Sequence, residues 1–144
     1  LFMPQRILLI IAHGSRRGAS NDEVHDLARR VENMNPSRFD ATRVAFLELA
    51  EPTIPEALAD SASLGAQEIT VLPYFLAAGT HVTVDIPEEL AAFRRQFPHV
   101  GLIVTDHLGA APNLPQTLLD LATAHFQQMP TRLHDPYSRH LPKH

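Results

Sequence analysis

Two histidines carry the chemistry that this sequence offers most readily. His13 and His81 each follow an apolar run, and Glu48 closes another such run with a carboxylate. Two imidazoles and a carboxylate are suitable ligands for divalent cobalt, nickel or iron. A structural metal site normally closes with four ligands, so a set of two or three suits an ion that must be handed on.

The same imidazoles could also accept protons, because a neutral histidine titrates near physiological pH. One pair of side chains could therefore hold a metal ion and remove protons from the molecule that receives it. Asp106 and His107 follow a further apolar run. His107 could add a ligand or simply face water, and we favour the second interpretation.

Ser15, Arg16 and Arg17 follow His13 closely and predict a site for anionic groups. Guanidinium groups pair bidentately with carboxylates, which suits a substrate that bears many acid side chains. Neighbouring arginines in a loop are more often solvated surface, so the pair alone is weak evidence. The sequence has no glycine-rich nucleotide-binding pattern, which leaves nucleotide binding little support.

Four apolar runs, each followed by a turn and a segment with helical spacing, must position these residues. The pattern predicts strands over 6–12, 42–47, 68–76 and 101–105. The runs are nearly continuous in Ile, Leu and Val, as expected of parallel strands that helices cover on both faces. We therefore predict an α/β fold with a small doubly wound sheet of four mainly parallel strands flanked by helices.

Each predicted helix starts with a capping-box pattern, in which a small polar residue stands three positions before Glu or Gln. The four patterns occupy residues 20–23, 53–56, 85–88 and 113–116. In doubly wound folds, ligands bind beyond the carboxyl ends of the strands. Because His13 and His81 both follow strands, we predict that they lie across one cleft at that edge, close enough to share an ion.

The composition limits the class of protein. With 144 residues, 44% of them apolar, we expect one domain over residues 1–129 and a mobile tail over 130–144. The lack of cysteine excludes disulfides, thiolate zinc sites and cysteine-ligated iron–sulfur clusters. A net charge of −4 offers no basic field for nucleic acid, and the run over 7–12 is too short to span a membrane. We therefore expect a cytoplasmic protein that binds neither nucleic acid nor membrane.

Three segments resemble the small CbiX-type sirohydrochlorin chelatases. They are LLIIAHGSRRGASNDE over 8–23, AFLELAEPTIPEAL over 45–58 and VLPYFLAAGTHVTVDIPEEL over 71–90. The resemblance covers residues 6–128. It implies a chelatase-type α/β domain, similar to half of the two-lobed class II chelatases that include protoporphyrin ferrochelatase, and a homodimer.

The resemblance also implies an activity and roles for single residues. The family's metal-binding and proton-accepting histidines fall on His13 of HGSR and His81 of GTHV, and its glutamate falls on Glu48, which could equally be a solvated strand end. The implied reaction inserts Co²⁺, Fe²⁺ or Ni²⁺ into sirohydrochlorin without ATP or a permanently bound cofactor, for cobalamin or siroheme. Residues 106–109, Asp-His-Leu-Gly, depart from the family's usual Pro-Leu-Gly segment.

Two other functions remain open. A tetrapyrrole- or metal-carrying protein would keep the fold and the histidines but would not turn over, and a metal-insertion assay separates it from a chelatase. A hydrolase or phosphatase could use His13 and Ser15 near a helix N-terminus. That reading needs a nucleophile–base pair, which the local spacing does not display.

Overall fold

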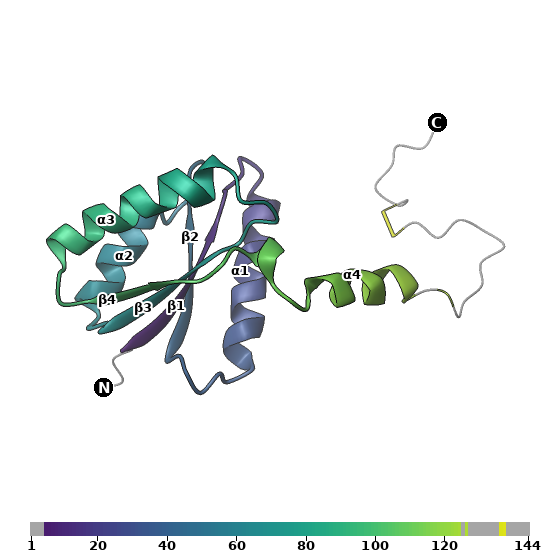
Figure 1. Ribbon diagram of the computed structural model, residues 1–144, viewed down its shortest axis with the longest axis horizontal. Helices are drawn as coiled ribbons and strands as arrows, with labels where there is room; N and C mark the ends of the chain where they lie inside the picture. Colours follow the sequence, from purple (N-terminus) through teal and green to yellow (C-terminus); the bar gives the residue numbers. More distant parts are fainter. Residues whose placement is uncertain (1–4, 125, 127–135, 138–144) are drawn as a thin grey trace. The chain divides into compact units, whose positions relative to one another are not determined.

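The computed structural model describes residues 5–124, 126 and 136–137 (Figure 1). In this part of the chain four strands form a parallel sheet with the order β2-β1-β3-β4. The strands are β1 (Arg6–Ala12), β2 (Ala41–Phe46), β3 (Glu68–Pro73) and β4 (Gly101–Val104). Since β1 and β3 are the inner pair, the segments that follow them emerge next to each other at the carboxyl edge. The predicted α/β fold with a parallel sheet is confirmed.

The strand limits agree closely with those predicted from the apolar runs. β1 matches its predicted range, and β2 and β4 differ from theirs by single residues. β3 ends at Pro73 rather than at residue 76, because the backbone N–H of Phe75 turns back to the Pro73 carbonyl at 3.0 Å. The chain therefore leaves the sheet earlier than predicted and forms a loop before His81.

Helices cover both faces of the sheet (Figure 1). The long helix α1 lies on one face, and α2 and α3 lie together on the other. Two short helical turns, η1 and η2, follow the third and fourth strands. The bounds are α1 (Gly18–Asn33), α2 (Ile54–Ser63), η1 (His81–Asp85), α3 (Ile86–Gln96), η2 (Leu108–Ala110) and α4 (Leu114–Thr123).

β1 shows why its sequence is apolar at every position. Alternate side chains point to opposite faces of a strand. Ile7, Leu9 and Ile11 pack with residues of α2 and α3, whereas Leu8 and Ile10 pack towards α1. All five are less than 8% exposed. Burying one such side chain contributes about 1.5–3 kcal/mol, so β1 is held firmly between both helical layers.

Only one of the four predicted capping boxes is present. Thr53 caps α2: its hydroxyl accepts from the Glu56 backbone N–H, and the Glu56 carboxylate accepts from the Thr53 backbone N–H. The boxes predicted at 20–23, 85–88 and 113–116 are wrong, because the N-caps of α1, α3 and α4 make no side-chain capping bond. α1 begins at Gly18, two residues before Ser20, so Ser20 lies inside the helix.

The chain divides into two compact units, residues 1–111 and 112–144. The second unit contains α4, whose side chains Leu118, Leu119 and Leu121 are 59%, 59% and 71% exposed. Of the tail predicted over 130–144 only residues 136–137 are described, so its mobility stays a prediction. Among the described residues, none of the helices combines the length and the apolar character that crossing a membrane requires.

Asp40 ties the start of β2 to the start of β1. Its carboxylate accepts hydrogen bonds from the backbone N–H groups of Arg6 at 2.9 Å and Gln5 at 3.2 Å. The bond from the Arg6 N–H is the main reason why the pKa of Asp40 lies below its usual 3.8, and it outweighs the opposite effect of desolvation. The ionised carboxylate therefore stabilises the fold.

We expect Asp40→Asn to lower the urea-unfolding midpoint at neutral pH, because an amide oxygen is a weaker acceptor than a carboxylate. A lowered folded-state pKa gives stability that is fully present above the unfolded value, 3.8, and is lost as the pH falls through the folded value. The difference in urea-unfolding midpoint between the wild type and Asp40→Asn should therefore disappear in strong acid. Asp60→Asn, which removes an exposed carboxylate, is the control. A difference in midpoint between the wild type and Asp40→Asn that persists in strong acid would contradict this role of the Asp40 carboxylate.

Candidate active site

His13 is the first residue beyond β1, and it lies beside the end of β2. The backbone N–H of Leu47 donates to the Ala12 carbonyl at 3.0 Å, and that of Glu48 donates to the His13 carbonyl at 3.1 Å. The β1–β2 hydrogen bonding thus continues past both strand ends. It brings the Glu48 carboxylate oxygen Oε1 to 3.4 Å from His13 Nε2.

Gly14 gives this junction its shape. Its φ of +94° lies in the left-handed region that favours glycine. A Cβ at this position would lie 1.8 Å from the Glu48 carbonyl oxygen, so the two backbones approach as closely as glycine allows. The turn also brings the Gly14 carbonyl to 3.0 Å from His13 Nδ1.

His81 reaches the same place from the other inner strand. It begins η1, a π-helical turn in which the backbone N–H groups of Val82 and Thr83 bond to the Gly79 carbonyl. The imidazole rings of His13 and His81 lie edge to face, with centroids 4.9 Å apart. The two histidines thus lie together at the carboxyl edge, as predicted, and their sharing of a metal ion stays a prediction. The centroid of the Phe75 ring lies 6.3 Å from that of His81.

Asp85 is a site residue that the sequence pattern did not reveal. Its carboxylate Oδ2 lies 2.7 Å from His81 Nδ1. The pattern predicted Asp85 as the start of a capping box, but its backbone is helical and its side chain makes no cap bond. The signal that could have revealed it is the four-residue spacing from His81, which brings two side chains onto one side of a helical turn.

The site is open and acidic. The side chains of His13, Glu48, His81 and Asp85 are 40–56% exposed. A cavity of about 210 Å³ adjoins His81, and its lining residues are Leu47, Glu48, His81, Asp85, Glu88 and Glu89. Across the described ranges, no set of three or more histidine and acidic side chains is arranged to hold a metal ion. The arrangement is a facing pair of imidazoles with carboxylates around it.

The CbiX family model matches residues 7–124. The chain belongs to the CbiX family. It is 41% identical over 83 residues to a sirohydrochlorin cobaltochelatase of Methanopyrus kandleri, an alignment that covers 58% of this chain and 57% of the relative. It is 31% identical over 111 residues to one of Sulfurisphaera tokodaii, covering 77% and 86%. A chloroplastic sirohydrochlorin ferrochelatase of Arabidopsis thaliana is 31% identical over 102 residues, with coverage of 71% and 44%.

Solved structures share the fold of this CbiX-family chain. A putative cobalamin biosynthesis CbiX protein from Marinobacter aquaeolei aligns with a TM-score of 0.71 at 25% identity, covering 87% of this chain and 99% of that one. SirB from Bacillus subtilis with Fe³⁺ aligns with a TM-score of 0.74 at 25% identity, covering 83% and 47%. The alignment thus spans nearly all of the Marinobacter aquaeolei chain and about half of the Bacillus subtilis chain.

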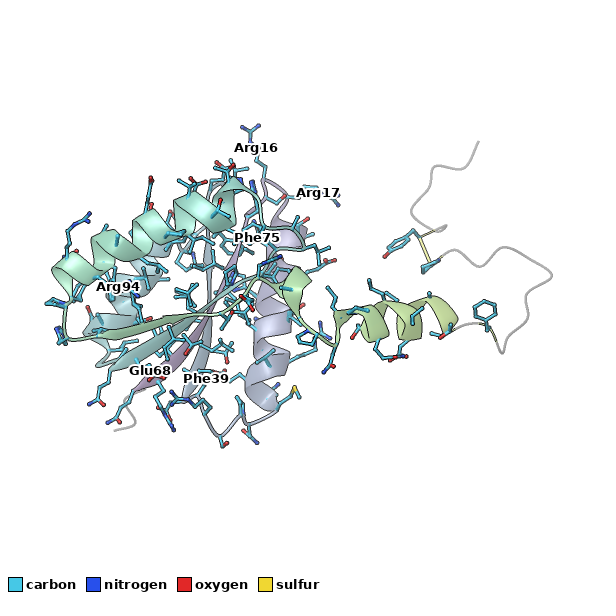
Figure 2. All side chains as sticks on the ribbon, in the orientation of Figure 1. Arg16, Arg17, Phe39, Glu68, Phe75 and Arg94 are labelled. Atoms are coloured by element: carbon cyan, nitrogen blue, oxygen red, sulfur yellow. The ribbon has the colours of Figure 1, made fainter. Side chains whose placement is uncertain are left out.

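The loop after His13 in the CbiX-family chain is held by Asn21. The Asn21 side chain accepts from the Ser15 backbone N–H at 2.9 Å and donates to the Ser15 carbonyl at 2.8 Å. The Ser15 hydroxyl accepts from the Arg17 backbone N–H, so it serves the turn. Arg16 and Arg17 are exposed and extend outward from the loop (Figure 2). The substrate-binding role of Ser15, Arg16 and Arg17 stays a prediction.

The loop after β4, where the chain departs from the family's pattern, keeps the glycine on which its path depends. The Gly109 N–H donates to the Phe75 carbonyl at 2.9 Å, and a Cβ on Gly109 would lie 1.7 Å from the Leu76 carbonyl oxygen. His107 is half-buried, and within residues 5–124 no side-chain hydrogen bond or ion pair joins it to His13 or His81. The remaining histidines outside the described residues are His125, His134, His140 and His144.

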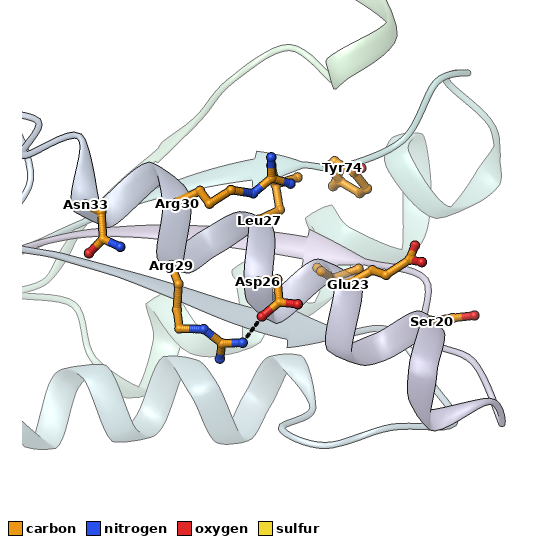
Figure 3. A pocket seen from close by; sticks show the side chains of 9 residues that line it. Ser20, Glu23, Asp26, Leu27, Arg29, Arg30, Asn33 and Tyr74 are labelled. Atoms are coloured by element: carbon orange, nitrogen blue, oxygen red, sulfur yellow. Dashed lines mark hydrogen bonds and ion pairs between the residues drawn. The ribbon is translucent and has the colours of Figure 1, made fainter. Parts of the chain in front are cut away.

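A larger cavity, of about 710 Å³, lies along α1 (Figure 3). Neither His13 nor His81 is among its lining residues. It combines side chains of both charges, and Arg29 is paired with Asp26 one turn away on the same helix. Its lining residues are Ser20, Glu23, Val24, Asp26, Leu27, Arg29, Arg30, Asn33 and Tyr74. The volume of a cavity therefore does not indicate the active site in this protein, because no histidine lines this larger cavity.

We expect Gly14→Ala to destabilise the protein by about 1–2 kcal/mol from the left-handed φ, with a further cost from the clash with the Glu48 carbonyl. The control is Gly79→Ala, because a Cβ there meets nothing within 4 Å. Urea unfolding of both variants measures the difference. Equal stability of the two variants would contradict the close approach of the backbones at Gly14.

Proposed function

We propose that this chain is a chelatase that inserts a divalent metal ion into sirohydrochlorin without ATP. The observation that carries the proposal is the meeting of His13 and His81, whose ring centroids are 4.9 Å apart at the carboxyl edge of the sheet. Relatives that are named sirohydrochlorin cobaltochelatase and ferrochelatase support the substrate class and both Co²⁺ and Fe²⁺ as substrates. Ni²⁺ fits the same nitrogen and oxygen donors.

The histidine pair suits a transient metal site. A neutral imidazole donates a nitrogen lone pair to ions of this class, and two such donors bind an ion without enclosing it. The open faces of His13 and His81, at 46% and 42% side-chain exposure, leave room for a second ligand molecule on the ion. The ion can then pass from the imidazoles to the ring nitrogens without all of its bonds breaking at once.

The reaction also requires proton acceptors. A divalent ion replaces two pyrrole protons, so the products are the metallated ring and two protons. A positioned base typically contributes about 10²- to 10⁴-fold to the rate of a proton transfer. His13 and His81 can accept these protons once the metal has left them. Glu48, with Oε1 at 3.4 Å from His13 Nε2, can pass a proton on to solvent.

The charged side chains around His13 and His81 favour binding of the metal ion on one side and of the tetrapyrrole on another. The carboxylates of Glu48, Asp85, Glu88 and Glu89 line the cavity next to His81 and attract a divalent cation. The guanidinium groups of Arg16 and Arg17 extend from the loop after His13 and can pair with acid side chains of the tetrapyrrole. Cation and macrocycle would therefore approach the histidines over surfaces of opposite charge.

We expect His81→Ala to lower the rate of metal insertion by about 10²- to 10⁴-fold while sirohydrochlorin binding changes little. The reason is that the imidazole acts on the ion and the protons, whereas arginine side chains hold the acid groups of the ring. The insertion rate follows from the visible spectrum of the ring, and ring binding is measured without metal. His107→Ala removes a half-buried imidazole from the same edge and serves as the control.

The outcomes separate the competing roles. Near-normal turnover of His81→Ala would remove His81 from the mechanism. A wild-type protein that binds ring and metal but never joins them would be a carrier, which is the alternative function for the same fold.

We further propose that the working form is a homodimer. The histidine site adjoins a cavity of only about 210 Å³, and a macrocycle needs walls on both faces to be held and desolvated. Apolar side chains suited to a contact between copies are exposed on two elements. Ile103 and Val104 of β4 are 45% and 46% exposed, and Leu118 and Leu121 of α4 are 59% and 71% exposed.

We expect Leu118→Lys to shift the protein from dimer towards a single chain of 16.0 kDa and to reduce insertion, because a charge would enter an apolar contact. Leu118 is 59% exposed in one copy, so the change should leave the fold of that copy intact. Gln116→Lys adds the same charge to α4 next to Asp120, its present partner, and is the control. Light scattering that shows only single chains in an active wild type would defeat the proposal.

A further inference from the structure

The contact between His81 and Asp85 is short and has a defined direction. His81 Nδ1 lies 2.7 Å from Asp85 Oδ2, and both residues line the cavity of about 210 Å³. An ionised carboxylate has no hydrogen to donate, so the hydrogen of this bond comes from Nδ1. In a neutral imidazole the other nitrogen then carries the free lone pair. The bond therefore determines which atom of His81 is available to a metal ion.

The backbone keeps the two side chains together. The N–H of Ile86 bonds to the His81 carbonyl, five residues back, and this closes a π-helical turn with His81 at its start and Asp85 at its end. Such turns occur frequently at functional sites. Asp85 is the last residue of η1, and the helix α3 continues from Ile86 with the buried side chains Ile86, Leu90 and Phe93. The position of Asp85 is thus set by a packed helix.

In His13, too, Nδ1 is the ring nitrogen that bonds to a protein acceptor, although the acceptor is a backbone carbonyl. Its Nδ1 lies 3.0 Å from the Gly14 carbonyl oxygen, which can only accept a hydrogen bond. Its Nε2 faces Glu48 at 3.4 Å. Two acceptor atoms that face each other at this distance are stabilised by a cation or a proton between them. In both histidines, Nδ1 is occupied by a protein acceptor, and Nε2 is left for chemistry.

We propose that Asp85 is a positioning residue that holds His81 as the Nδ1–H tautomer, with its ring orientation fixed and Nε2 presented to the metal ion. Carboxylate partners of this kind raise the basicity of a ligating histidine, and their loss typically lowers metal affinity about 10- to 100-fold. This inference rests on the proposed function for the role of the ion. The tautomer itself belongs to the metal-free protein and can be tested without turnover.

The first readout is the ¹⁵N spectrum of the His81 ring in the metal-free protein, identified by its disappearance in His81→Ala. The wild type should show a protonated Nδ1 and an unprotonated Nε2. Asp85→Asn should keep this tautomer, because the amide oxygen still accepts from Nδ1. Asp85→Ala should show a mixture of both tautomers. Unchanged His81 resonances in Asp85→Ala would overturn the proposal.

The second readout is the affinity for Co²⁺ alone, measured by titration. Asp85→Ala should bind Co²⁺ about 10- to 100-fold more weakly than the wild type, and Asp85→Asn should lie between them. Glu89→Gln measures the contribution of cavity charge alone, because Glu89 lines the same cavity but, within residues 5–124, has no hydrogen bond or ion pair with His81; it should weaken Co²⁺ binding less than Asp85→Asn does. Equal weakening in Glu89→Gln would assign the effect to general charge around the cavity and overturn a specific role of Asp85.

Asp85→Asn keeps the test valid if Asp85→Ala fails to fold, because the amide is nearly isosteric with the carboxylate. A wild-type affinity for Co²⁺ in Asp85→Asn would then contradict the proposal. In turnover, a positioning role predicts that Asp85→Asn lowers kcat and leaves KM for the ring unchanged. If the tautomer and Co²⁺ results hold while the wild type inserts no metal, the proposed function fails and the inference about Asp85 stands.

Discussion

The continuation of the β1–β2 hydrogen bonds beyond the strand ends is the constraint on which the site depends. The Glu48 N–H donates to the His13 carbonyl, and Gly14 turns away directly over the Glu48 backbone with a φ of +94°. β1 itself is buried on both faces, so its end cannot shift without disturbing two helical layers. His13 therefore leaves the sheet in one direction, and that direction points at η1.

His81 is held in place by a helical turn, whereas His13 is held by the end of a strand. His81 stands on a π-helical turn that leads into α3, and Ile86, the first residue of α3, is 1% exposed. The turn thus couples an exposed imidazole to a buried helix start. Rigid supports on both sides explain how two half-exposed rings can keep a fixed relation in an open site, which a metal ion and a large ring must both enter and leave.

The capping boxes illustrate where local patterns fail. Thr53 has the extended backbone of an N-cap and forms the predicted reciprocal bonds with Glu56. Asp85 satisfies the same pattern, but its carboxylate bonds to His81 because the preceding π-turn leaves it no free helix terminus to cap. Ser20 satisfies it too, yet α1 has already begun at Gly18. A pattern of residue types does not show whether the helix starts there or earlier.

The sequence by itself determined the strands, the parallel sheet and the edge at which His13, Glu48 and His81 follow them. These depend on apolar periodicity and on β-α alternation, which can be recognised in each segment of the sequence separately. Only the tertiary structure decided that the His13 and His81 rings meet edge to face, that Glu48 lies beside His13, and that Asp85 belongs to the site. Those relations join residues from different strands and depend on the strand order β2-β1-β3-β4, on a close backbone approach at Gly14 and on a π-turn, none of which has a residue pattern of its own.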